Sequence, residues 1–264
     1  MEGSIGRAEA VSGVSGRMVA TRHGRVHLVE QGPRDGTAIV LLHGASGNLR
    51  DWRISLMPAL PRSWRVIAVD RPGFGHSDPA PGQGWRLGPQ GETIRAALSR
   101  IGAERVILVG HSWSGALVLD WALRHPGEVA GIHVLSGATM DWGGRLGPHY
   151  QLIAAPGIGR VVASIVPHLV TRRLVESQLS EIFAPQPVPP GYAERGGVNL
   201  ALRPHTFRTN AQALTDLHSQ IRANQPRYPE IRCPVEIQHG TEDRLVPAEI
   251  HAEPLARMLP EARL

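Results

Sequence analysis

Short apolar runs separated by stretches of helical length recur along the chain. Five such runs are rich in Val, Ile and Leu, and they occupy residues 38–42, 65–69, 106–109, 131–135 and 235–238. Unbroken apolar runs of this length, alternating with helical segments, predict parallel strands that are buried on both faces of a sheet. We therefore expect an α/β fold built from βα units.

Other elements of the same fold are predicted around these runs. Residues 17–22 and 26–30 flank His23-Gly24-Arg25, which indicates an antiparallel hairpin ahead of the parallel strands. Apolar residues at helical spacing predict three helices, over residues 91–101, 114–125 and 247–258.

The alternation of strands and helices stops over residues 138–230. The first half of this insertion carries apolar residues at mixed helical spacings: Leu152, Ile153, Val161, Val162, Ile165, Val166, Leu169 and Leu174. A Pro-rich turn at 185–191 and a further helical stretch at 198–223 follow. Because an apolar stripe needs a surface to bury against, we predict a helical cap packed over the sheet, roofing a pocket.

This organisation divides the chain into three parts. We expect a flexible Gly- and Ser-rich tail over residues 1–16, a core formed by 17–137 together with 231–264, and the cap over 138–230. The length of 264 residues suits one large α/β domain with an insertion better than two independent domains.

Composition limits the possible classes of protein. Hydrophobic residues make up 42% of the chain and charged residues 19%, and no apolar run is long enough for a membrane span. The N-terminus lacks a basic region followed by an apolar stretch, so we expect no signal peptide and a cytoplasmic location. The net charge of +5 comes from dispersed Arg without a single Lys. Dispersed Arg does not predict nucleic-acid binding, and the lack of Lys excludes a Schiff-base mechanism.

The strongest chemical signal is V-I-L-V-G-H-S-W-S-G at residues 106–115. An apolar strand runs into a turn of small residues and then into a helix, which is the context of a nucleophilic serine held on a strained turn. Ser114 replaces the last glycine of the usual G-x-S-x-G pattern, and Gly115 follows it. The alternative is an ordinary turn in which Ser112 only caps the helix.

Two further segments stand at strand ends, H-G-A-S-G at 43–47 and D-R-P-G-F-G-H-S-D at 70–78. Together with the serine motif they resemble the α/β-hydrolase fold family. The resemblance implies a mainly parallel sheet with flanking helices and a helical cap inserted after the sixth strand. It also implies that Ser112 is the nucleophile and that the backbone N–H groups of Ala45 and Trp113 form an oxyanion hole. Four residues of these motifs are expected to be structural: His43, Asp70, Asp78 and His111.

The catalytic acid is expected in the segment V-E-I-Q-H-G-T-E-D-R-L-V-P at 235–247, which resembles the acid loop of the same family. Asp243 is the predicted acid, which would orient an imidazole and stabilise its protonated form. Its neighbour Glu242 and the distant Asp141 are the alternatives.

The histidine of the triad is the difficulty. In this family it follows the acid in the chain, but only His251 lies beyond Asp243, early in the last predicted helix, where we expect it to be exposed. A cap histidine is a further alternative: His168, His205 or His218. We expect a sequence cut short before the histidine, with the eighth strand and last helix missing or incomplete. The run at 235–238 would then be an unpaired apolar sheet edge, and the chain as given would have impaired activity.

The sequence thus predicts a serine hydrolase that acts on a small, hydrophobic acyl ester through an acyl-enzyme. Alternatives with the same serine are a perhydrolase, a C–C bond hydrolase and a non-catalytic ligand-binding member of the family. Members that open epoxides or remove halides use a carboxylate nucleophile, so Ser112 argues against both activities. No cofactor is expected, and no metal, because the histidines show no ligand spacing and Cys233 stands alone.

Overall fold

The computed structural model describes residues 16–143 and 146–264. The predicted tail lies outside the described residues except for Gly16. The described chain forms an eight-stranded sheet in the order β1-β2-β4-β3-β5-β6-β7-β8. The strands are β1 (Arg17–Thr21), β2 (Gly24–Gln31), β3 (Ala38–Leu42), β4 (Val66–Val69), β5 (Val106–His111), β6 (Val129–Leu135), β7 (Val235–Gln238) and β8 (Ala262–Arg263).

The sheet confirms the predicted α/β architecture. β2 pairs antiparallel with β1 and with β4, and all pairs from β4 to β8 are parallel. Every residue of β4 is buried, as its unbroken apolar sequence predicts for a central strand.

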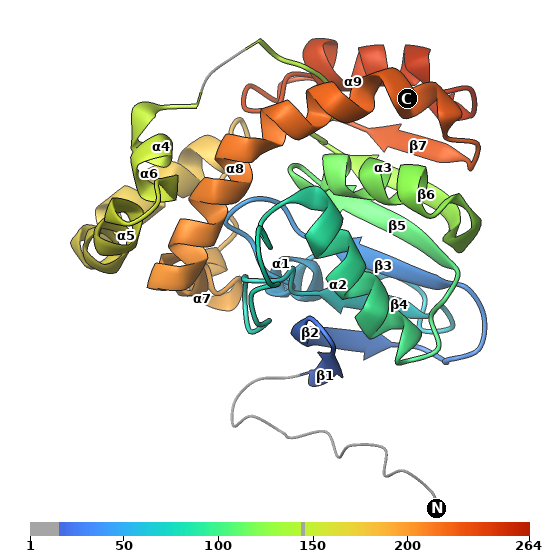
Figure 1. Ribbon diagram of the computed structural model, residues 1–264, viewed down its shortest axis with the longest axis horizontal. Coiled ribbons are helices and arrows are strands. Elements are labelled where there is room, and N and C mark those ends of the chain that lie inside the picture. The colour runs from blue at the N-terminus through green and yellow to red at the C-terminus, as the bar shows by residue number, and fades with distance from the viewer. Residues whose placement is uncertain (1–15, 144–145) are drawn as a thin grey trace, which may run out of the picture.

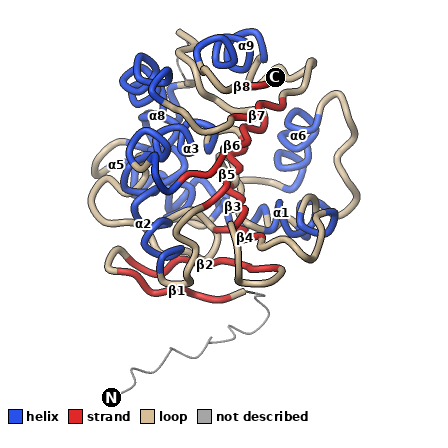
Figure 2. Tube along the Cα trace, turned by 90° about the vertical axis from the view of Figure 1, so that its right-hand side faces the viewer, coloured by secondary structure: helices blue, strands red, loops and turns tan. Residues whose placement is uncertain are grey.

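Helices cover both faces of the sheet (Figure 2). Helices α2 (Leu87–Ser99), α3 (Ser114–Arg124) and α9 (Ala248–Met258) pack on one face, and α1 (Arg50–Ile54) packs on the other. Short 3-10 turns occur at Met57–Ala59, Pro126–Glu128, Val198–Leu202 and Gln225–Glu230. Helix α2 begins four residues earlier than predicted, because Pro89 is tolerated in a first helical turn and Leu87 packs into the core.

Five of the described α-helices lie between β6 and β7, where the sequence predicts the insertion. They are α4 (Pro148–Ala154), α5 (Ile158–Leu169), α6 (Arg172–Phe183), α7 (Tyr192–Arg195) and α8 (Pro204–Asn224). In Figure 1 the helices α4 to α7 gather at one side of the sheet, and the long α8 runs from them towards α9. None of the described helices is by itself long and apolar enough to cross a bilayer. Only α4 and α5 taken together have that composition, across a bend of 117°.

The expected burial of the insertion's apolar stripe is wrong for most of its residues. Ile153 is buried, but five others are about half exposed or more: Leu152, Val161, Ile165, Leu169 and Leu174. The reason is that α5 packs against α8 through Ala163 and Ala211 rather than lying flat on the sheet. The opposite side of α5 therefore faces solvent.

The eighth strand corrects another expectation. β8 lies beside β7, with Val235 paired to Ala262 and Glu236 paired to Arg263. The first half of β7 is thus not an unpaired edge. With this strand near the C-terminus, the structure gives the expected truncation no support.

Candidate active site

Ser112 stands at the turn between β5 and α3 in a left-handed backbone conformation, with φ of +51°. Its N–H donates to the carbonyl oxygen of Leu135 at 2.9 Å, and its own carbonyl accepts from Gly115 and Ala138. Non-glycine residues adopt this conformation only where surrounding bonds enforce it, which is common at functional sites. Ser112 does not cap α3, whose N-cap position is Trp113 and has no side-chain cap.

Ser114, which replaces the motif's last glycine, is fully buried. Its hydroxyl donates a 2.5 Å hydrogen bond to the carbonyl oxygen of His43. The serine that replaces the usual glycine therefore links the turn at Ser112 to the H-G-A-S-G loop by a hydrogen bond. Gly115 is required next to it, because an added Cβ there would lie 2.8 Å from the Cα of Gly137.

We expect Ser114→Ala to lower the free energy of unfolding by about 1 kcal/mol, the usual contribution of one intramolecular hydrogen bond. Alanine fits the space, and the His43 carbonyl keeps its bond from Arg71. Urea unfolding measures the effect, with Ser99→Ala on the exposed end of α2 as the control. Equal stability of the two variants would mean that the Ser114 bond contributes nothing.

The H-G-A-S-G loop lies against the turn that carries Ser112. A Cβ added to Gly44 would lie 3.0 Å from Ser112 Cβ and 3.0 Å from His111 Nδ1, a close contact that a side chain could make only if these neighbours moved. Within the described residues, neither the Ala45 N–H nor the Trp113 N–H has a hydrogen-bond acceptor. Two backbone donors beside Ser112 are thus left for another group.

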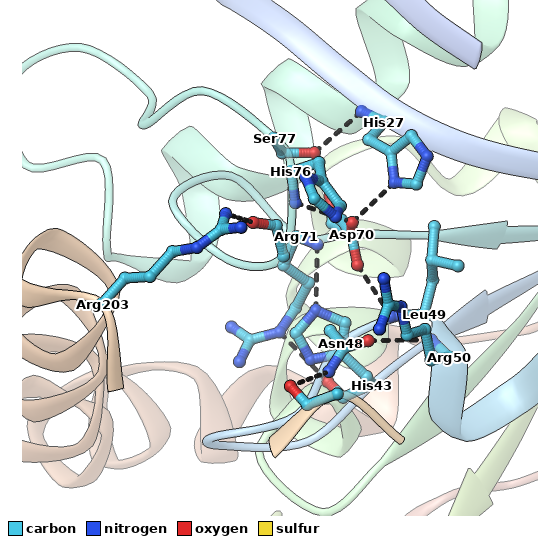
Figure 3. A network of polar contacts seen from close by, with 12 residues as sticks. His27, His43, Asn48, Leu49, Arg50, Asp70, Arg71, His76, Ser77 and Arg203 are labelled. Atoms are coloured by element: carbon cyan, nitrogen blue, oxygen red, sulfur yellow. Dashed lines mark hydrogen bonds and ion pairs between the residues drawn. The ribbon is translucent and has the colours of Figure 1, made fainter. Parts of the chain in front are cut away.

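Arg71 packs against His43 of this loop and is fully buried (Figure 3). Its guanidinium donates to the carbonyl oxygens of His43 and Gly44 at 3.0 and 2.9 Å, and to Gln90 at 2.9 Å. It also lies 4.1 Å from the centre of the Trp113 ring. Burial lowers the pKa of Arg71 to about 9, so it stays charged at neutral pH.

The bonds to Gly44 fix the direction of the next N–H. In a trans peptide the C=O of one residue and the N–H of the following residue point in opposite directions. The Gly44 carbonyl is held by Arg71 and by His43 Nδ1 at 2.9 Å. The Ala45 N–H must therefore point away from this buried cluster.

His43 and Asp70 hold the cluster together, as expected for structural residues. The backbone N–H of Arg71 donates to His43 Nε2, and burial lowers the pKa of His43 to about 3, so its ring is neutral. Burial alone would raise the pKa of Asp70, but its bond to His27 at 2.7 Å and further contacts outweigh this and lower it. Asp78 forms an ion pair with Arg25.

Asp243 lies in a tight turn after β7. Its Oδ1 accepts from the N–H groups of Leu245 and Val246 at 3.0 and 2.9 Å, and its Oδ2 lies 3.5 Å from His239 Nε2. His111 is partly exposed to solvent. Partial burial of its ring lowers the pKa of His111, and the negative charge of Asp243 acts in the opposite direction. The Asp243 carboxylate thus acts on the residue next to Ser112.

The alternative acids are placed differently. Glu242 is exposed. Asp141 pairs with His218 and with Arg222, both on α8, and the bond from His218 lowers its pKa.

The expectation that His251 is exposed is wrong. Its ring is buried, and its Nδ1 accepts from the N–H groups of Thr139 and Met140 at 3.3 and 3.2 Å. Burial lowers the pKa of His251 to about 4. The face of α9 that carries His251 packs against the loop after β6. His251 is therefore a buried hydrogen-bond acceptor for that loop.

The insertion's histidines are also engaged elsewhere or exposed. His168 is exposed on α5, His205 bonds to Thr206, and His218 bonds to Asp141. Within residues 16–143 and 146–264, none hydrogen-bonds to Ser112 Oγ. In the same part of the chain, no group of three or more His, Cys, Asp or Glu is placed to hold a metal ion.

Sequence reasoning missed Arg71 and Asn210. Arg71 stands in the D-R-P-G segment that follows a buried strand. A charged residue so close to a buried strand end was the sequence signal that could have identified it. Asn210 on α8 accepts from the Ser46 N–H at 2.8 Å and donates to its hydroxyl, which ties the insertion to the H-G-A-S-G loop. Nothing in its sequence surroundings marks it.

A family model described as alpha/beta hydrolase fold matches residues 37–264. Over 157 residues, or 57% of the chain, the sequence is 34% identical to the dihydrolipoyllysine-residue acetyltransferase component of the acetoin cleaving system from Pseudomonas putida, of which it covers 41%. Over 247 residues it is 28% identical to 2-hydroxy-6-oxo-2,4-heptadienoate hydrolase from Pseudomonas putida, covering 89% of the chain and 81% of that protein.

The chain spans less than half the length of the first curated relatives that it matches, which include epoxide hydrolases. A solved hydrolase from Pseudomonas aeruginosa PA01 has a TM-score of 0.74 at 21% identity, covering 95% of this chain and 89% of that one. At this identity the likeness shows the fold.

Proposed function

The chain belongs to the α/β-hydrolase fold family, and we propose that it is a serine hydrolase that cleaves an ester or a related acyl substrate. The observation that carries this proposal is the left-handed turn at Ser112, which lies against a loop whose Ala45 N–H has no acceptor among the described residues. Residues 17–137 and 231–264 would form the core, and residues 138–230 would form the cap over a hydrophobic substrate.

The proposed reaction has two steps. Ser112 Oγ attacks the carbonyl carbon, its proton passes to a base, and the negative charge on the carbonyl oxygen is met by the N–H groups of Ala45 and Trp113. The intermediate collapses to an acyl-enzyme, and the leaving alcohol takes up the proton. Water then adds to the acyl carbon and releases the acid and the free serine. One such donor is typically worth about 3 kcal/mol in the transition state.

Arg71 would support both donors as a positioning residue. It binds the Gly44 carbonyl and so directs the Ala45 N–H, and its guanidinium stacks on the Trp113 ring. The indole of Trp113 donates in turn to the Ala213 carbonyl of α8 at 3.0 Å, which holds that residue between core and insertion.

The described residues do not supply the base that the first step needs. Asp243 would orient an imidazole, but none of the described histidines bonds to both Asp243 and Ser112. We therefore propose that the 264-residue chain turns over substrate slowly.

A second candidate is hydrolysis of a C–C bond beside a ketone by the same serine. The match to 2-hydroxy-6-oxo-2,4-heptadienoate hydrolase, which covers most of both chains, supports this second candidate. Product analysis with an activated ester and with a vinylogous 1,5-diketone separates the two. The serine at position 112 remains an argument against epoxide opening, despite the epoxide hydrolases among the relatives.

Labelling with a fluorophosphonate tests the nucleophile. We expect phosphonylation of Ser112, its loss in Ser112→Ala and its retention in Ser136→Ala. Ser136 is the matched control, because it also has a positive φ and lies at the end of the neighbouring strand β6. If the protein stays unlabelled even with imidazole added as a base, Ser112 is not an activated serine.

A further inference from the structure

A pocket lies between the core segment 72–85 and the helices α5 and α8. Its volume is about 390 Å³, within the range of small-molecule sites. None of the proposed active-site residues lines it. The pocket is therefore separate from the site described above.

The charged groups of this pocket are all basic. Arg160 on α5 and Arg208 on α8 line it, and no Asp or Glu from the described part of the chain does. Burial and the charge of Arg203 lower the pKa of His205, the third basic residue of the lining, so the positive charge comes from the two arginines. The guanidinium of Arg160 has neither a hydrogen bond nor an ion pair to a described residue.

Arg208 is held in place by neutral acceptors only. Its Nη2 lies 3.5 Å from the Ala155 carbonyl oxygen. With the Gln212 amide turned so that its oxygen faces the guanidinium, Gln212 accepts from Nη1 and Nη2 at 3.1 and 3.2 Å. The Nε of Arg208 is buried without a partner. The guanidinium is thus positioned in advance, and its charge is not neutralised.

Apart from the polar Thr209 and Gln212, the rest of the lining is apolar and partly flat. Pro72, Pro79 and Trp85 come from the core, and Ala163 and Pro204 come from the insertion. The Trp85 indole is fixed by a 2.7 Å bond to Asp216, which leaves its ring as a rigid wall. Walls of this kind bind a planar apolar body, while the two arginines require an anionic group.

We propose that this pocket binds a small organic anion with a carboxylate or phosphate group and a flat apolar body. The anion would pair with Arg160 and Arg208, and the body would lie against Trp85. Helix α8 separates this ligand from the active site: Thr209 and Gln212 line the pocket, whereas Asn210 bonds to Ser46 of the H-G-A-S-G loop.

Isothermal titration calorimetry of the 264-residue protein tests the proposal with 1-naphthylacetate, the anion of 1-naphthaleneacetic acid. Its neutral amide, 1-naphthylacetamide, is the comparison. We expect the carboxylate to bind one to one and about tenfold more tightly than the amide, as for one charge-assisted hydrogen bond. Arg160→Gln and Arg208→Gln should each weaken the binding of 1-naphthylacetate about tenfold. The control Arg173→Gln removes an exposed arginine of α6 outside the pocket and should leave the affinity unchanged.

Inorganic phosphate tests whether the apolar walls matter, and it should bind more weakly than 1-naphthylacetate. Equal affinity of the amide and the carboxylate would overturn the proposal, and so would unchanged affinity in Arg160→Gln. Arg160 is exposed, so its variant should fold even where Arg208→Gln does not. None of these outcomes depends on Ser112, so the proposal stands or fails independently of the proposed function.

Discussion

Arg71→Met should slow the phosphonylation of Ser112 by a fluorophosphonate about 100-fold, because the Gly44 carbonyl then keeps only its bond from His43 Nδ1 and loses the one from Arg71. With one of these two bonds lost, the Ala45 N–H can shift away from the reacting oxygen. The effect should lie in the maximal labelling rate, and the reagent concentration for half-maximal rate should change little. Such a split indicates a group that acts in the transition state and not in reagent binding.

Arg65→Met is the matched control for this variant. Arg65 is equally buried, and its guanidinium bonds to Glu30 and to the carbonyls of Arg34, Ile101 and Gly102, at the other end of β4. Both variants should lose stability, by about 1–3 kcal/mol for each buried acceptor left without a donor. Only Arg71→Met should lose labelling. An equal rate in the two folded variants would remove Arg71 from the site, whereas no labelling of the unsubstituted protein even with imidazole added would contradict Ser112 itself.

Most of the core fold was predictable from the sequence, because its signals are local. The apolar run at 66–69 is buried on both faces, and Gly24 closes the hairpin between β1 and β2. The helix that starts at Ser114 begins where predicted. In each case a short segment carries the information for its own conformation.

The insertion was predicted less well, because periodicity does not say which face of a helix is covered. The spacing of Val161 and Ile165 indicates a helix correctly, yet these side chains face solvent since α5 packs through Ala163 instead. His251 shows the reverse error. Its polar character suggested exposure, but two backbone N–H groups that come from a distant loop meet its ring.

The candidate site divides in the same way. Ser112 and Asp243 stand in motifs with a local shape, and the sequence could single them out. Arg71 is different, because its neighbours His43, Gly44 and Trp113 are brought together by three strand ends that are far apart in the chain. The direction of the Ala45 N–H depends on how these strand ends pack together, and no single segment of the sequence determines it.

Added imidazole should raise the Ser112-dependent hydrolysis of 4-nitrophenyl acetate by the 264-residue chain by up to about 100-fold. A general base contributes about 10² to 10⁴ to such reactions, and no described histidine reaches both Ser112 and Asp243. The rate is measured against imidazole concentration, and the rate of Ser112→Ala is subtracted because imidazole itself attacks this ester.

Asp243→Asn should reduce this response, because the amide cannot stabilise the imidazolium that forms during attack. Asp141→Asn is the matched control, since Asp141 is an exposed aspartate whose partners His218 and Arg222 lie on α8. Rapid turnover without imidazole, and no response to it, would contradict the proposal that no described residue acts as the base. One of the chain's own histidines would then have to approach Ser112, and His251→Gln and His218→Gln would identify which one, because only the loss of the true base abolishes turnover. The response to imidazole thus distinguishes a serine that lacks its base from one that never reacts.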